Sequence, residues 1–313
     1  MNKRYGIPYM GSKNSIAQWI LQFLPRAENF YDLFCGGCAI THAAIEQNKY
    51  RRYFINDIKP DMPKGFVDCI NGKYINDHRW ISRDDFDLLK GGDDLLVNVC
   101  FSFGNNWEKG GYAYGKELEP YKKAIHYAVL FNEYHLLNDL FGVEVPEHIS
   151  QIDDKLERYY LIRKLIRDGS DLGKERKFHS LENLERIQSL ERLNTLISLS
   201  DLRKRNSDII WSSKSYDEVE ILDNSVIYCD IPYKDTKTYS ENAFDHDKFY
   251  DWCLRQTKPV FVSEYNMPSD KFVCIGEKLK QIKMSAQDKT QSSIERIFVP
   301  IHQSGLIPKT TLF

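Results

Sequence analysis

Apolar and aromatic residues follow two different periods over the first sixty positions. Spacings of four between apolar residues predict a helix over residues 14–24, which a proline ends. Aromatic-rich segments at residues 29–34 and 52–57 predict strands, and a helical pattern at residues 39–47 lies between them. We therefore predict a βαβ unit with a right-handed crossover at the start of the chain.

The alternation of helix and strand then stops until residue 225. A helix is predicted over residues 120–140, and amphipathic helices are predicted over residues 156–167 and 181–199, the last with apolar residues at steps of three and four. Between residues 155 and 205, 13 Lys and Arg stand against 8 Asp and Glu. For any single helix, an ordinary solvated face explains these charges, but together they indicate a locally basic helical region.

Strand patterns return at residues 225–230, 259–263 and 296–301. Because both ends of the chain carry them, we predict one discontinuous α/β domain around an insertion of different character. The predicted boundaries are residues 1–60 and 206–313 for the α/β domain and residues 61–205 for the mostly helical insertion.

The composition excludes several classes of protein. The chain has 313 residues, 13% of them aromatic, and a net charge of -2, which excludes a disordered chain. No run approaches the roughly 18 apolar residues that cross a bilayer, and the start is too short for a signal-peptide core, so we expect a cytoplasmic protein. Seven cysteines, an odd number spread along the chain, indicate reduced thiols rather than a disulfide framework.

A glycine-rich turn follows the first predicted strand. Asp32, Phe34, Gly36 and Gly37 occupy this strand end and turn, where a ligand can approach the backbone at the carboxyl end of a parallel sheet. Asp57 ends the second strand, where an acid can accept hydrogen bonds from ribose hydroxyls. The pattern predicts nucleoside binding, whereas the missing third glycine of G-x-G-x-x-G argues against NAD.

The same turn contains a C-x-x-C pair, Cys35 and Cys38. Redox proteins place such a pair at a strand-to-helix turn, so a thiol oxidoreductase remains an alternative. A structural zinc site would need a second pair of ligands, and the other five cysteines are isolated in the sequence. We therefore expect no metal site.

A carboxylate, a fixed turn and an aromatic ring follow the buried strand at residues 225–229. These groups could hold a planar base such as adenine by its exocyclic amine. If the Asp230 carboxylate and the Ile231 carbonyl each accept one N–H of this amine, the lone pair of its nitrogen can point at an electrophile. Pro232 fixes the turn, and Tyr233 can stack on the base, a contact worth about 1–3 kcal/mol. Taken alone, a strand-ending Asp before a Pro-Tyr turn is also common in ordinary α/β proteins.

Three segments in this order resemble the Dam-like (D12 class) DNA N6-adenine methyltransferases. They are residues 8–13 (P-Y-M-G-S-K), 32–37 (D-L-F-C-G-G) and 230–233 (D-I-P-Y). The resemblance implies a Rossmann-like, S-adenosylmethionine-dependent methyltransferase fold with an inserted target-recognition domain. It also implies site-specific methyl transfer from S-adenosylmethionine to a flipped adenine in double-stranded DNA.

The resemblance assigns roles residue by residue. The residues implied to bind the cofactor are Tyr9, Lys13, Asp32, Phe34, Gly36, Gly37, Asp57 and Asp230. The residues implied to be catalytic are Asp230, Ile231, Pro232 and Tyr233. Ile231 stands where the family has proline, but the expected contact uses the backbone carbonyl, so we expect activity. A catalytically impaired relative that still binds S-adenosylmethionine and DNA is the alternative.

The insertion is implied to hold the DNA around the flipped adenine. The candidate contacts are Asn105, Asn106, Tyr112, Tyr114, Arg163, Lys164, Arg203, Lys204 and Arg205. The sequence does not separate residues that read bases from residues that hold phosphates.

Two further expectations follow from the resemblance. The protein would act as a monomer or weak dimer in a bacterial or phage-infected cell, alone or beside a cognate restriction endonuclease. Relatives that methylate cytosine N4, RNA or a glutamine amide usually carry Asn or Ser at the position of Asp230, so the aspartate favours adenine.

Overall fold

The computed structural model describes residues 4–9, 11–105, 110–169, 186–205, 207–233, 244–282 and 291–306. The chain divides into two compact units. The first unit contains Met1–Ile7, Gly11–Asn71 and Asp201–Phe313, and the second contains Pro8–Met10 and Gly72–Ser200. Within the described ranges, no helix combines the length and the apolar composition that crossing a membrane requires.

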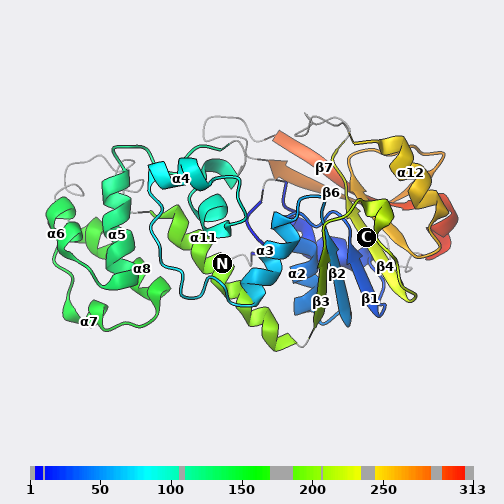
Figure 1. Cartoon of the computed structure of the whole chain (residues 1–313). Helices are drawn as coiled ribbons and strands as arrows, with labels where there is room; N and C mark the ends of the chain where they lie inside the picture. Colours follow the sequence, from blue (N-terminus) through cyan, green and yellow to red (C-terminus); the bar gives the residue numbers. More distant parts are fainter. Residues whose placement is uncertain are drawn as a thin grey trace. The chain divides into compact units, whose positions relative to one another are not determined.

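In the part of the first unit that the structure describes, seven strands form one sheet in the order β3-β2-β1-β4-β5-β7-β6 (Figure 1). Strands β3, β2, β1, β4 and β5 are parallel, and β7 runs antiparallel to β5 and β6. The strands are β1 (Asn29–Asp32), β2 (Arg52–Asn56), β3 (Asp208–Ser212), β4 (Ser225–Asp230), β5 (Val260–Glu264), β6 (Phe272–Ile282) and β7 (Gln291–Pro300).

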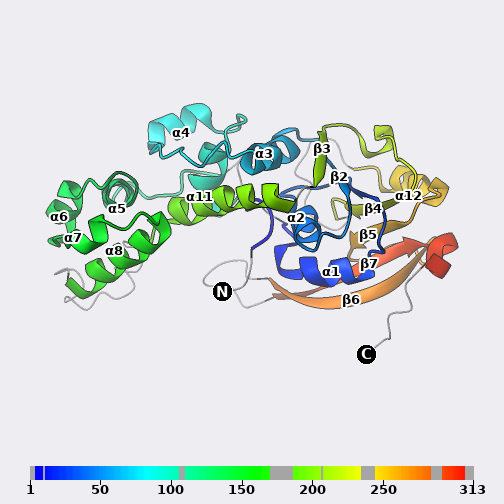
Figure 2. The same cartoon turned by 90° about the horizontal axis from the view of Figure 1, so that it is seen from below.

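Helices pack on this sheet, because its central strands carry apolar side chains on both faces. Tyr31 of β1 lies in a buried hydrophobic cluster with Phe249 of α12, whereas the adjacent Phe30 stacks on Tyr50 with ring centroids 4.9 Å apart. Successive strand residues point to opposite faces, so a strand covered on both sides reads as a continuous apolar run. The helices are α1 (Ala17–Phe23), α2 (Ala39–Glu46), α3 (Asp61–Ile70) and α12 (His246–Arg255). Figure 2 shows α1 beside α2, which it contacts.

The predicted α/β class is confirmed, and the mixed seven-stranded sheet is consistent with the Rossmann-like methyltransferase fold expected from the sequence. Two strands were not predicted, β3 at the edge and β6 in the antiparallel hairpin. In β3, Ile210 and Trp211 are both exposed, so this edge strand lacks the alternation that identifies a half-buried strand.

In the described residues, the second unit contains helices and a short antiparallel hairpin, in which Ser102 pairs with Tyr112. In the described residues these helices are α4 (Arg83–Leu89), η2 (Leu96–Cys100), η3 (Phe103–Asn105), α5 (Glu119–Phe131), α6 (His135–Phe141), α7 (Glu147–Ser150), α8 (Lys155–Gly169) and α11 (Gln188–Ser198). The single helix predicted over residues 120–140 is wrong. Asn132 adopts a left-handed conformation with φ of 58° and ends α5, so the chain turns before α6 begins. The start of the helix predicted from residue 181 lies outside the described residues.

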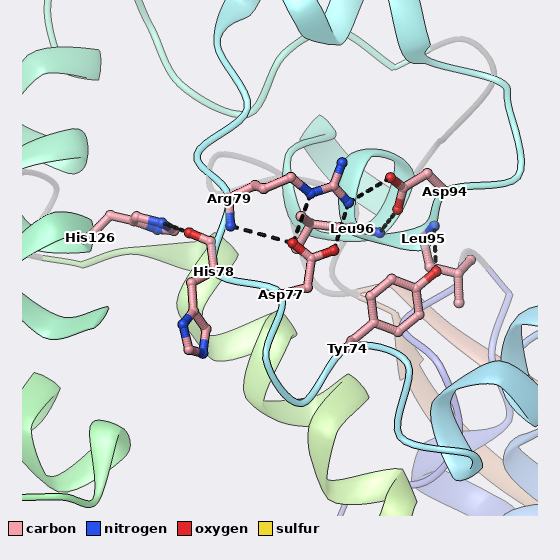
Figure 3. A network of polar contacts seen from close by, with 8 residues as sticks. All are labelled: Tyr74, Asp77, His78, Arg79, Asp94, Leu95, Leu96 and His126. Atoms are coloured by element: carbon pink, nitrogen blue, oxygen red, sulfur yellow. Dashed lines mark hydrogen bonds and ion pairs between the residues drawn. The ribbon is translucent and has the colours of Figure 1, made fainter. Parts of the chain in front are cut away.

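An ionic and hydrogen-bonded network holds the chain that enters the second unit (Figure 3). The Arg79 guanidinium lies 2.6 Å from Asp77 and 2.9 Å from Asp94. The Tyr74 hydroxyl accepts a hydrogen bond from the Leu95 amide at 3.2 Å, and His126 Nε2 lies 2.8 Å from the His78 carbonyl oxygen. These contacts fix the extended segment against η2 and α5.

Besides Pro8–Met10, the second unit contains Gly72–Ser200, whereas the insertion is predicted to begin at residue 61 and to end at residue 205. These boundaries of the insertion stay a prediction. Helix α3, which lies between residues 61 and 72, contacts β3 and belongs to the first unit. The role of the second unit in target recognition stays a prediction.

Gly6 brings the N-terminal segment against the glycine turn. The Ile7 amide donates to the Gly37 carbonyl at 2.7 Å, and the Gly6 amide donates to His42 Nδ1 at 2.8 Å. Gly6 has φ of +69°, and a Cβ there would overlap the Gly37 carbonyl oxygen and the Ala39 backbone nitrogen. This close approach requires glycine.

We predict that Gly6→Ala destabilises the protein more than Gly11→Ala. Both glycines have positive φ, which costs an alanine about 1–2 kcal/mol, but a Cβ at Gly11 meets nothing within 4 Å. Overlap with backbone at Gly6 should add about 1–3 kcal/mol. Urea unfolding measures both losses, and equal losses would contradict the proposed close approach.

Candidate functional site

The central parallel strands bring the two predicted motifs to one edge of the sheet. Strands β1 and β4 are neighbours, with Asp32 paired to Tyr228, and Asp230 ends β4 two residues later. The Leu33 amide donates to the Tyr228 carbonyl at 3.1 Å, which extends this pairing into the turn. The strand order reverses between β1 and β4, and ligands bind at such reversals in open α/β sheets.

Asp57 organises the glycine turn through backbone hydrogen bonds. Its Oδ2 accepts from the Gly36 amide at 2.9 Å and its Oδ1 accepts from the Lys59 amide at 3.1 Å. Burial of the carboxyl group raises the pKa of Asp57, although these hydrogen bonds oppose the shift. Gly36 has φ of 43°, which is left-handed, so glycine suits this position.

Asp32 is buried behind the turn. Its Oδ2 accepts a hydrogen bond from the Thr41 hydroxyl of α2 at 2.7 Å, and the residue is 1% exposed. Burial raises the pKa of Asp32 to about 7, and the negative charges of Asp230 and Asp57 add to this effect. At neutral pH this carboxyl group is therefore partly protonated.

A buried ion pair joins the N-terminal motif to the late Asp-Ile-Pro-Tyr corner. Lys13 Nζ lies 2.6 Å from Asp230 Oδ1 and 3.6 Å from Glu295 Oε1. Burial lowers the pKa of Lys13, but the charges of Asp230 and Glu295 outweigh it and raise the pKa above the usual value. Lys13 is therefore charged, and its ammonium lies 4.7 Å from the centroid of the Tyr233 ring.

The Ile-Pro segment of this corner is anchored from both sides. Ile231 is 2% exposed and its side chain belongs to the hydrophobic cluster that contains Phe249 and Val262. Pro232 is exposed, and its carbonyl oxygen lies 2.9 Å from His246 Nε2. The isoleucine side chain thus adds core packing, while the backbone of the corner is held by α12.

Phe34 lies among aromatic rings that sequence analysis had not connected with it. Its ring centroid is 5.5 Å from that of Tyr216, 5.7 Å from Phe244 and 5.8 Å from Phe249. Phe34 and Phe244 are half-buried, so part of this aromatic wall remains accessible beside the glycine turn. Tyr216 was missed because residues 213–222 carry no strand or helix period.

Comparison with known proteins agrees with this geometry. Residues 9–77 match the model of the D12 class N6 adenine-specific DNA methyltransferase family. The match confirms the family resemblance over the segment that holds Lys13, the glycine turn and Asp57. Asp230 and Tyr233 lie outside the matched range. Their place in the same candidate site as the glycine turn therefore depends on the adjacency of β1 and β4. No curated protein matches the chain.

The thiols of the glycine turn do not suit redox chemistry. Cys35 and Cys38 are both buried. Burial raises the pKa of each thiol, which is the opposite of the lowered pKa found in reactive thiols. This environment favours the D12 class methyltransferase over the thiol oxidoreductase. Among the described residues, no cluster of His, Cys, Asp and Glu is arranged to hold a metal ion.

Two of the predicted DNA contacts are core residues. Tyr112 and Tyr114 are 8% and 5% exposed, and their hydroxyls donate to the Ile81 carbonyl and the Ser189 hydroxyl, both at 2.7 Å. Both rings and hydroxyls are thus used inside the second unit, and the role of these two residues as DNA contacts stays a prediction. Phe103, in the same hairpin, is 67% exposed.

The predicted basic contacts have different environments. Arg203 donates to the carbonyls of Ile70 and Asn71 at the end of α3, which makes it a helix cap. Lys204 pairs with Asp201 at 2.7 Å, and the guanidinium of Arg163 lies 5.5 Å from the centroid of the Tyr159 ring. Lys164 and Arg205 are exposed. Asn106 and the side chain of Asn105 lie outside the described residues. Tyr9 is half-buried and belongs to the second unit.

We predict that Asp32→Asn weakens the pH dependence of stability. A carboxyl group with a raised folded pKa binds more protons when folded, so its stabilising contribution is full below the unfolded value of 3.8 and is lost as pH rises through about 7. In the wild type, Asp32 should lower the free energy of unfolding by up to about 1.4 kcal/mol for each pH unit of increase within this window, and the variant should lack this decrease. Urea unfolding at several pH values measures the slope, with the exposed Asp270→Asn as control. Identical slopes in both variants would contradict the burial effect.

We also predict that Cys35→Ser retains most of its methylation activity, because a buried, protonated thiol contributes no nucleophile. In the folded wild-type protein, iodoacetamide should modify the exposed Cys274 before Cys35 or Cys38. Rapid modification of Cys35, together with loss of activity in Cys35→Ser, would instead support thiol chemistry.

Proposed function

We propose that this chain transfers a methyl group from S-adenosylmethionine to N6 of an adenine in double-stranded DNA. The observation that carries the proposal is the adjacency of β1 and β4, which brings the glycine turn and the Asp230–Tyr233 corner to one sheet edge. The family match over residues 9–77 supports an adenine-specific DNA methyltransferase independently of this geometry.

The residues of the glycine turn fit S-adenosylmethionine. When bound, this cofactor supplies an activated methyl group on a sulfonium. Asp57 offers carboxylate oxygens to ribose hydroxyls, and Gly36 and Gly37 place no side chains at the middle of the turn. Phe34 and Phe244 offer aromatic surface for a planar adenine ring, while Tyr9, Lys13 and Asp32 stay predicted contributors to the cofactor site.

The Asp-Ile-Pro-Tyr corner would hold the substrate base. The Asp230 carboxylate and the Ile231 carbonyl would accept the two N–H groups of adenine N6, which directs the nitrogen lone pair at the methyl donor. Tyr233 would stack on the base. Because Lys13 lies against Asp230, its ammonium compensates the charge of a carboxylate that is 22% exposed.

The second unit would hold the DNA. Flipping a base out of the duplex costs a few kcal/mol, which contacts to the backbone and an inserted side chain can offset. The exposed Phe103 is a further aromatic candidate beside Tyr112 and Tyr114, and Lys164 stays a candidate for phosphate contact. A cytoplasmic location stays a prediction from the sequence, and a partner endonuclease stays a prediction from the resemblance. A catalytically impaired relative stays the alternative to an active enzyme.

Expression in a methylation-free bacterium, followed by sequencing for N6-methyladenine, tests the activity, the base and the site together. The wild-type chain should produce methylated adenine in one sequence context. Asp230→Ala should lower methylation roughly 10²–10⁴-fold, because the amine loses its carboxylate partner, while S-adenosylmethionine still binds.

The exposed Asp223→Ala is the matched control and should retain wild-type methylation. Undiminished methylation by Asp230→Ala would refute the role of Asp230. Absence of N6-methyladenine with the wild type, under conditions where it binds S-adenosylmethionine and DNA, would favour the impaired relative.

A further inference from the structure

Glu295 is a buried carboxylate at a position where the strand pattern predicts an apolar side chain. It lies in β7 and is 1% exposed, and Ile297 and Val299, which share its face, are 0% and 2% exposed. An ionised carboxylate in such surroundings is strongly unfavourable unless charged or hydrogen-bonding partners compensate it. Its partners therefore identify its role.

Both described partners of the Glu295 carboxylate belong to the proposed catalytic site. The Tyr233 hydroxyl donates a hydrogen bond to Glu295 Oε1, and Lys13 Nζ lies 3.6 Å from the same oxygen. Lys13 also lies 2.6 Å from Asp230. One carboxylate thus connects the base-stacking ring with the lysine that holds the base-binding carboxylate.

The contacts of Tyr233 restrain its ring from several directions. The hydroxyl is bound by Glu295, the Lys13 ammonium lies 4.7 Å from the ring centroid, and the Tyr265 ring centroid lies 4.3 Å away. A ring that stacks on a flipped base must keep its plane while the base enters. Anchoring the hydroxyl at the far end of the side chain restricts rotation about χ1. The hydroxyl oxygen lies on the axis of χ2, so the ring plane is restrained by the Lys13 ammonium and the Tyr265 ring.

We infer that Glu295 is a positioning residue for methyl transfer, which orients Tyr233 through its hydroxyl and Lys13 through its ammonium. The inference rests on the proposed function. Glu295 touches neither the base nor the cofactor in this role, so its loss should affect the rate of transfer more than the binding of S-adenosylmethionine.

Tyrosine labelled with ¹³C at Cζ tests the contact without requiring activity. The NMR signal of Tyr233 is assigned by its absence in Tyr233→Phe. Glu295→Gln should shift this signal, because the hydroxyl loses a charged acceptor. Glu277→Gln is the matched control, since Glu277 lies in the same hairpin, is exposed and pairs with Arg296 at 2.6 Å. An unmoved Tyr233 signal in Glu295→Gln would overturn the inference.

Kinetics then test the consequence, with tritiated S-adenosylmethionine and genomic DNA from a methylation-free bacterium. Glu295→Gln should lower kcat roughly 10- to 100-fold and leave the Kd for S-adenosylmethionine unchanged, while Glu277→Gln keeps the wild-type kcat. Equal weakening of kcat and cofactor binding, with a lower Tm, would show a merely structural role and would overturn the inference.

A double variant separates positioning from general damage. If Glu295 acts through the Tyr233 hydroxyl, adding Glu295→Gln to Tyr233→Phe should reduce kcat by a smaller factor than it does in the wild type. Fully multiplicative losses would contradict coupling between the two residues. If the wild type incorporates no label, the proposed function fails, whereas the shift of the Tyr233 signal still decides whether Glu295 holds the ring.

Discussion

The parallel pairing of β1 with β4 is the constraint on which the site depends. It joins segments that are distant in the sequence, in the register Asn29 to Ser225 and Asp32 to Tyr228. Helices cover both faces of these strands, so the pairing is enclosed in the hydrophobic core and its register is strongly specified. A slip of one residue would turn every side chain of the strand to the other face. The position of the candidate site is therefore a consequence of core packing, and the polar residues at the strand ends are the candidates for its chemistry.

The charges at this edge show how a buried polar cluster can be tolerated. The positive charge of Lys13 compensates the negative charges of Asp230 and Glu295. Burial raises the pKa of Asp32 to about 7, so this carboxyl group is partly neutral and less charge is buried. The three charged groups Lys13, Asp230 and Glu295 still carry one more negative than positive charge. A sulfonium cation would meet a favourable potential beside such a cluster, without a further ionic residue from the protein.

The sequence predicted the features that depend on local pattern, and missed those that depend on contacts across the fold. The βαβ start, β4, β5 and the Asp230 corner follow from apolar runs and turn residues. By contrast, Glu295 and Tyr233 are 62 residues apart, and no local pattern indicates their contact. The aromatic, glycine-rich hairpin illustrates the same limit. Its composition suits DNA contact, yet internal hydrogen bonds commit Tyr112 and Tyr114 to the core and leave Phe103 exposed.

The cap that Arg203 places on α3 has a consequence for how such chains can diversify. The guanidinium binds the carbonyls of Ile70 and Asn71, so the chain is tied together just before it leaves the sheet-bearing unit and just after it returns. A segment whose two ends are fastened at one point can be lengthened, shortened or replaced with little strain on the strands behind it. Evolution could thus exchange the second unit at this junction while the sheet of the first unit stays the same.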